Sequence, residues 1–137
     1  MLAAVIDAPG PPDAIEYREI PTPSPTGAQV LVKVGAVAVN PIDTYIRGGT
    51  VAMMLPRPYI VGCDFAGVVE DVGPDVQFIK PGDRVWGSNQ GVLSRQGTFA
   101  QYTCVDEPWV YHTPKKVKDA DAVMNYSKES ITEKGKQ

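Results

Sequence analysis

The residues best suited to chemistry lie in one short stretch, N-P-I-D-T-Y-I-R over residues 40–47. Asn40 carries an amide that donates hydrogen bonds, and Tyr45 carries a phenol that stays protonated at neutral pH. Donors of this kind can stabilise an oxygen on which negative charge develops during a reaction. The stretch is therefore a candidate for a site that orients a carbonyl group.

Purely structural roles explain the same residues. Asn40 can cap a helix that starts at Pro41, because proline suits the first helical position. Tyr45 can pack its ring under the loop that follows. Asp43 and Arg47 are four residues apart, so an exposed ion pair on the helix accounts for them. The residues alone leave both interpretations open.

Period-two patterns predict the elements that position this stretch. Residues 29–39 form the clearest strand, and they deliver the chain to a helix over 40–47 at the rim of a sheet. Residues 62–85 predict a core strand over 65–72, where Ala66 and Gly67 leave room for another backbone, and a turn over 80–83. Residues 50–59 predict an apolar loop that contacts a ligand, a partner or the barrel itself. Further strands are expected over 1–7, 15–20, 76–79, 84–86 and 98–105.

Composition narrows the class of protein. The chain has 137 residues, with 13 Gly and 13 Pro, which favours one mainly β domain built from short strands. The net charge of -3 makes a nucleic acid or an anionic membrane an unexpected partner. Two cysteines, and an apolar start without a basic region, favour a reducing compartment, so a cytoplasmic location is expected.

Two longer motifs resemble a known family. Residues 62–85 contain G-x-x-x-A-G-V-V-E-x-V-G followed by K-P-G-D-R-V, which resembles the medium-chain dehydrogenase/reductase superfamily. Residues 39–49, V-N-P-I-D-T-Y-I-R-G-G, are similar to its zinc-independent, zeta-crystallin-like quinone oxidoreductase branch. The resemblance implies a GroES-like β-barrel with short helices over residues 1–122, which is the catalytic domain of alcohol dehydrogenase N-terminal type.

The resemblance also implies an activity and a set of site residues. Members of the branch pass hydride from NADPH to a quinone or a conjugated carbonyl such as an enone. Asn40 and Tyr45 match residues near the nicotinamide or the substrate and are the expected catalytic residues. Asn40, Ile42, Asp43 and Arg47 are expected to face the cofactor.

A metal is not expected at this site. In zinc-dependent relatives the matching positions hold cysteine, histidine and glutamate, whereas this sequence has Asn40, Cys63 and Asp64. With His112 as the only imidazole, these residues make a poor tetrahedral zinc set. Cys63 is expected to be a buried, inert thiol.

The C-terminal residues depart from the family pattern. The sequence has no G-x-G-x-x-G phosphate loop, and A-D-A-V-M-N-Y over 120–126 resembles a segment from deep inside the Rossmann cofactor domain. We therefore expect that domain to be largely absent, with residues 123–137 a flexible remnant and an in-frame loss at the join. The alternative to a truncated oxidoreductase is a non-catalytic barrel that serves association, for example as a homodimer.

Overall fold

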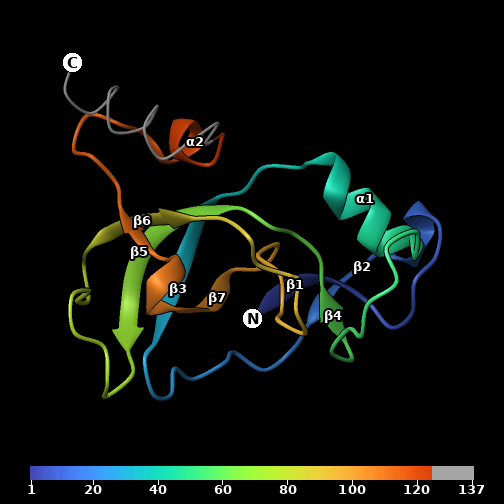
Figure 1. Cartoon of the computed structure of the whole chain (residues 1–137), viewed down its shortest axis with the longest axis horizontal. Coiled ribbons are helices and arrows are strands. Elements are labelled where there is room, and N and C mark those ends of the chain that lie inside the picture. Colours follow the sequence, from blue (N-terminus) through green and yellow to red (C-terminus); the bar gives the residue numbers. More distant parts are fainter. Residues whose placement is uncertain (125–137) are drawn as a thin grey trace.

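A computed structural model of the chain describes residues 1–124, which form two antiparallel sheets (Figure 1). The smaller sheet has the order β2-β1-β4, with β1 Leu2–Ile6, β2 Glu16–Glu19 and β4 Tyr59–Ile60. The larger has the order β7-β3-β5-β6-β8, with β3 Gln29–Ala36, β5 Phe65–Val72, β6 Arg84–Gly87, β7 Tyr102–Asp106 and β8 Tyr111–His112. A single bridge between Ala3 and Ala100 links β1 to the chain that leads into β7. The predicted mainly β class is confirmed.

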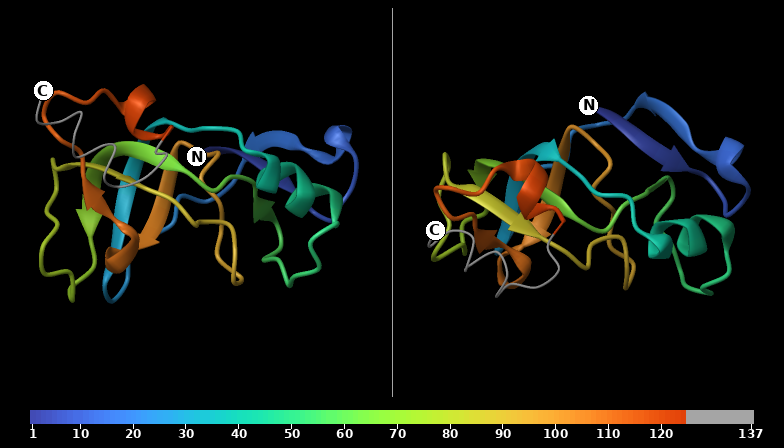
Figure 2. Two further views of the ribbon diagram at one scale, coloured as in Figure 1. Left: turned by 45° about the horizontal axis from the view of Figure 1, so that its top comes forward. Right: turned by 90° about the horizontal axis from the view of Figure 1, so that it is seen from above.

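The helices are short and lie outside the sheets. Helix α1, Pro41–Gly48, lies beside the smaller sheet, and α2, Asp119–Ala122, packs over β3 and β5 of the larger one (Figures 1 and 2). Two 3-10 turns, η1 Pro12–Ala14 and η2 Glu107–Trp109, complete the described elements. The predicted helix over 40–47 is thus present, and Gly49 ends it in the left-handed conformation that glycine adopts readily.

The main core is formed by side chains of the larger sheet. β3 and β5 pair along most of their length, and alternate residues of each strand join this core, because successive residues of a strand face opposite ways. Val30, Val32, Phe65, Val85 and Val105 are fully buried in this cluster. The strand that leads to the candidate site is therefore held at its start by the best-packed part of the molecule.

The backbone of β3 lies directly against Gly67 of β5. A Cβ atom at this position would overlap the backbone carbonyl of Lys33 on β3. The predicted narrow point in the core strand is confirmed, and the backbone that approaches it belongs to β3. The predicted turn over 80–83 is present as well, with Gly82 at a φ of 92°.

Three predicted strand ranges differ in the structure. Residues 76–79 form no strand, because their backbone N–H groups donate to the side chain of Glu107 instead of to a neighbouring strand. β7 begins at Tyr102, four residues later than predicted. β3 ends at Ala36, three residues before the predicted end at 39.

The end of β3 and the residues that follow it pack against α2. Ala36 and Ala38 pack on a cluster that contains Trp86, Ala122 and Val123. An ion pair of 2.9 Å between Arg84 Nη2 and Asp119 Oδ1 ties β6 to α2, and the same Arg84 nitrogen donates to the carbonyl of Val117 at 2.7 Å. The described C-terminal residues are therefore an integral part of the barrel.

Residues 125–137 lie outside the described part of the chain, and so does most of the predicted remnant over 123–137. Between residues 1 and 124 no helix has the length and apolar character to cross a membrane.

Candidate functional site

The candidate site begins where the chain leaves β3 and enters α1. Asn40 is the N-terminal cap residue, with an extended backbone, and its N–H donates to Asp43 Oδ2 at 2.8 Å. This is the backbone half of a capping box, in which the third helical residue reaches back to the cap. Asn40 is therefore fixed by the helix that it starts.

The Asn40 side chain also binds Asp64. Asn40 Nδ2 donates to Asp64 Oδ2 at 2.6 Å, and Ser88 Oγ donates to Asp64 Oδ1 at 2.5 Å. Thr98 Oγ1 donates to the backbone carbonyl of Asp64 at 2.7 Å. We call Asn40, Asp64, Ser88 and Thr98 the Asp64 network. It joins four segments that are far apart in the sequence, and Asp64 is only 8% exposed at its centre.

Asp43 lies beside this network and is more deeply buried. Its side chain is 4% exposed, and burial raises the pKa of its carboxyl group. The hydrogen bond from the Asn40 N–H opposes this rise in pKa, whereas the nearby charge of Asp64 adds to it. Asp43 from the start of α1 and Asp64 from the segment before β5 thus place two carboxyl groups next to Asn40.

The other predicted site residues take different places. Tyr45 is half exposed. Ile42 packs against the buried cluster of Ile6, Ile46, Tyr59 and Val61. Arg47 Nε donates to the carbonyl of Gly10 at 3.2 Å, which ties α1 to the turn after β1.

The predicted ion pair between Asp43 and Arg47 is wrong. Asp43 turns inward to the Asn40 N–H, and Arg47 turns to Gly10. Helical spacing places the two residues on one side of α1, but each side chain binds a backbone group instead, of Asn40 and of Gly10 respectively, and these bonds help to hold the helix in place. Both residues therefore position α1.

Cys63 precedes Asp64 and is inert by its surroundings. The thiol is 7% exposed, and burial raises its pKa to about 11, with the charge of Asp64 adding to the effect. A thiol with a raised pKa is a weak nucleophile and a weak metal ligand at neutral pH. Among residues 1–124, no three His, Cys, Asp or Glu side chains are placed to share a metal ion.

Sequence reasoning missed Ser88 and the part that Asp64 takes. The sequence did carry a signal for Asp64, because an acidic residue at the edge of an otherwise apolar, buried segment requires binding partners. Ser88 carried no comparable signal, since its partner lies 24 residues away.

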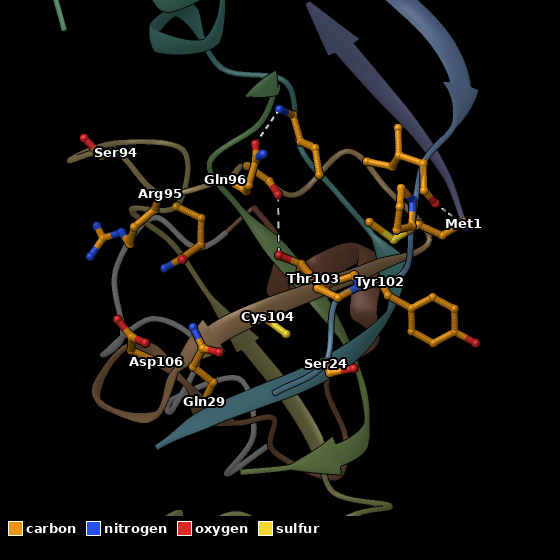
Figure 3. A pocket seen from close by; sticks show the side chains of 16 residues that line it. Met1, Ser24, Gln29, Ser94, Arg95, Gln96, Tyr102, Thr103, Cys104 and Asp106 are labelled. Atoms are coloured by element: carbon orange, nitrogen blue, oxygen red, sulfur yellow. Dashed lines mark hydrogen bonds between the residues drawn. The ribbon is translucent and has the colours of Figure 1, made fainter. Parts of the chain in front are cut away.

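A cavity of about 400 Å³ opens on the other side of the loop after β6 (Figure 3). Figure 3 shows β7 residues Thr103 and Cys104 on one side and the loop residues Arg95 and Gln96 on the other. The Arg95 guanidinium lies 5.0 Å from the centre of the Trp109 ring. Gln90 lines the cavity and donates to the backbone carbonyl of Ser88 at 3.1 Å.

Comparison with known proteins agrees with this architecture. Residues 26–115 match the model of the alcohol dehydrogenase GroES-like domain, which covers more than half of the chain. The chain belongs to this family, whose members carry the barrel described above. The predicted GroES-like fold and the predicted resemblance to medium-chain dehydrogenases are thereby confirmed.

The similar proteins include quinone oxidoreductases. The human quinone oxidoreductase is 40% identical over 109 residues, which are 79% of this chain and 32% of that protein. The solved structure of an alcohol dehydrogenase superfamily protein from Novosphingobium aromaticivorans is 38% identical, with a TM-score of 0.81, and covers 90% of this chain and 37% of that one. Mycobacterial Rv1454c, solved in complex with NADPH, is 29% identical with a TM-score of 0.82, over 92% of this chain and 38% of that one. The chain thus spans about a third of the length of the relatives that it matches.

Proposed function

We propose that this barrel is the substrate-side domain of a zinc-independent quinone oxidoreductase, in which Asn40 and Tyr45 face the reacting groups. The observation that carries the proposal is the Asn40 amide, held at the start of α1 by a buried carboxylate. The similarity to quinone oxidoreductases supports a quinone or conjugated carbonyl as the substrate class. NADPH supplies the hydride in such a reaction.

The residues at the start of α1 fit the carboxamide of a nicotinamide. Asn40 uses one side-chain N–H for Asp64, which leaves its second N–H for a ligand oxygen. Tyr45 is half exposed one turn further on and can donate its phenolic proton to a substrate oxygen. Ile42, Asp43 and Arg47 support the cofactor face by fixing α1, through packing, the cap and Gly10 respectively.

We further propose that residues 1–122 act as one domain that lacks its own phosphate site. The 137-residue sequence contains no glycine-rich phosphate loop, so the chain alone should bind the dinucleotide weakly. Without firm binding of NADPH, turnover of a quinone by the chain alone should be slow or absent.

The test is an NMR titration of the isotopically labelled chain with NADPH, with and without a small quinone. The proposal expects shifts at Asn40 and Tyr45, and loss of the Tyr45 response to quinone in Tyr45→Phe. Tyr17→Phe is the matched control, because Tyr17 is a 69% exposed tyrosine on β2. Millimolar NADPH that shifts neither residue, or shifts only remote ones, would contradict the proposal.

A second candidate function is association. Val39 is 75% exposed and Met54 is 85% exposed, and exposed apolar side chains of this kind can contribute to a contact between copies of the chain. We propose a homodimer as the alternative use of these surfaces. Light scattering across a hundredfold range of concentration tests it, and a constant monomer mass would count against it.

A further inference from the structure

We propose that the cavity between β7 and the loop after β6 binds a free amino acid with a large apolar side chain, whose carboxylate pairs with Arg95 and whose ammonium group pairs with Asp106. The cavity has a volume of about 400 Å³, which lies within the range of pockets that hold small organic molecules. None of the four residues of the Asp64 network lines it, so this inference does not depend on the proposed oxidoreductase site.

The first feature of the cavity is a cation without an anionic partner. Across residues 1–124, no carboxylate forms an ion pair with Arg95. Its Nη2 donates to the carbonyl of Asn89 at 2.5 Å, and the guanidinium lies over the Trp109 ring. Its Nε is buried and has no hydrogen-bond partner in the described part of the chain. A buried donor of this kind requires an acceptor, and a carboxylate matches the edge of a guanidinium.

The second feature is a pair of unused acceptors. Asp106 is the exposed last residue of β7, and no side chain or backbone group among residues 1–124 donates to its carboxylate. Gln90 is 1% exposed, and the one bond of its side-chain amide to a described residue runs from Nε2 to the Ser88 carbonyl, which leaves Oε1 able to accept. A carboxylate and an amide oxygen together suit an ammonium group, which carries three donors.

The turn η2 brings the two charged side chains to the same part of the cavity. Asp106 immediately precedes this turn, and Trp109 within it lies beneath the Arg95 guanidinium. Figure 3 shows Arg95 and Asp106 on the side of the cavity away from Met1. Burial raises the pKa of Cys104, which also lines the cavity, and the charge of Asp106 adds to this rise. Two opposite charges that line one cavity without pairing with each other match a ligand that carries both charges.

The third feature is an apolar wall. Five apolar residues, from the first strand, the segment after β2 and β4, line the cavity: Met1, Ile20, Pro21, Pro23 and Ile60. Apolar area removed from water stabilises a complex, so this wall favours an apolar side chain on the ligand. The cavity therefore offers a separate partner for each of the three parts of an apolar amino acid.

The test is an NMR titration of the isotopically labelled 137-residue chain with leucine and with three analogues that each lack one part. 4-Methylpentanoate lacks the ammonium group, 3-methylbutylamine lacks the carboxylate, and glycine lacks the side chain. Leucine should shift the indole N–H of Trp109 and the backbone N–H groups of Thr103 and Cys104, and each analogue should bind about tenfold more weakly or worse. The indole of Trp86 is the internal control, since Trp86 lies in the cluster under α2.

Two variants assign the two ends of the ligand. Asp106→Asn should weaken leucine about tenfold and leave 4-methylpentanoate unchanged, whereas Arg95→Gln should weaken leucine about tenfold and leave 3-methylbutylamine unchanged. Arg95→Lys keeps the charge and should weaken leucine by a smaller factor, so it serves if Arg95→Gln fails to fold. Arg57→Gln is the matched control, because Arg57 is an exposed arginine in the loop between α1 and β4.

High-millimolar leucine that shifts none of the cavity residues would overturn the proposal. Equal affinity for leucine and 4-methylpentanoate would overturn it too, as would a leucine response that is unchanged in a folded Asp106→Asn chain. No arm of this experiment contains NADPH, so its failure and the failure of the proposed function can be told apart.

Discussion

The carboxylate of Glu107 accepts a hydrogen bond from the backbone N–H of Phe78 at 2.9 Å, across 29 residues of sequence. The same carboxylate accepts from the N–H groups of Gln77 and Ile79 at 3.1 and 3.2 Å. One side chain thus satisfies three backbone donors that a strand would otherwise pair. This contact explains why an apolar stretch that looks like a strand is a loop.

Glu107→Gln should make stability less dependent on pH. Partial burial raises the pKa of Glu107, but the N–H groups of Phe78, Gln77 and Ile79 outweigh it and hold the pKa below its ordinary value. Because the pKa of Glu107 is lower in the folded state, its carboxylate stabilises the fold at pH values above the unfolded pKa of 4.5. This stabilisation is lost as the pH falls through the folded pKa. At pH 7 the variant should be about 1 kcal/mol less stable, from weaker hydrogen bonds. Urea denaturation at pH 7, 5 and 3 measures this, and an equal gap between the two chains at all three pH values would contradict it.

Gly67→Ala should destabilise the barrel by about 3 kcal/mol or prevent folding, because the new Cβ would meet the backbone of β3 rather than a flexible side chain. Gly48→Ala is the matched control. Gly48 lies in α1 with open space around it, so alanine there should be neutral or stabilise by about 0.5–1 kcal/mol. Thermal unfolding followed by circular dichroism compares the two variants. A Gly67→Ala chain as stable as the unmodified one would show that β3 and β5 can separate at little cost.

Both cysteines should resist alkylation in the folded chain. Burial raises the pKa of Cys63 and of Cys104 to about 11, from an ordinary value of 9.0. Since the thiolate is the reactive form, a rise of two units in pKa makes the reaction with iodoacetamide at pH 8 about a hundredfold slower in the folded chain than in the chain unfolded in urea. Mass spectrometry resolves the two sites. A native rate within a few-fold of the unfolded rate at either cysteine would refute the assignment for that site.

Asn40→Asp should set two carboxyl groups against each other at the contact that Asn40 now makes with Asp64. The pair can persist only by sharing a proton, so the folded state should raise one carboxyl pKa well above its ordinary range. A carboxyl group whose pKa is raised in the folded state stabilises the fold at pH values below its unfolded pKa, and this stabilisation is lost as the pH rises through the folded pKa. The variant should therefore be about 2 kcal/mol less stable than the unmodified chain at pH 7 and recover toward pH 4. Carbon-13 NMR titration of the carboxyl groups follows the shared proton. Two carboxyls that both titrate near pH 4 would show that the contact is not made.

Sequence reasoning found the elements whose cause is local. The strand over 65–72 and the turn over 80–83 follow from β-branched residues and from Gly82, and α1 follows from Asn40–Pro41 at one end and Gly49 at the other. These signals depend only on neighbours in the sequence, so the elements that they predict are the ones found in the structure. The family motif added the barrel topology, which local patterns alone do not specify.

Contacts between distant segments were beyond local patterns. Residues 76–79 have strand-like side chains, but Glu107 binds their backbone from elsewhere in the chain. Asp43 and Arg47 have the spacing of an ion pair, yet Asn40 and Gly10 compete for them successfully. Asp64, in the segment before β5, became part of the site only because the start of α1 and the loop after β6 converge on it.

The chain has two tryptophans, and the fold places them in different surroundings. Trp86 is buried in the cluster under α2, with its ring 5.0 Å from that of Tyr111, whereas Trp109 lies beneath the Arg95 guanidinium at the cavity. Each indole therefore serves as an optical probe for one region. A chain that retains Trp86 alone would show when α2 detaches, and one that retains Trp109 alone would show when the cavity loop moves, so intrinsic fluorescence can separate local opening from global unfolding.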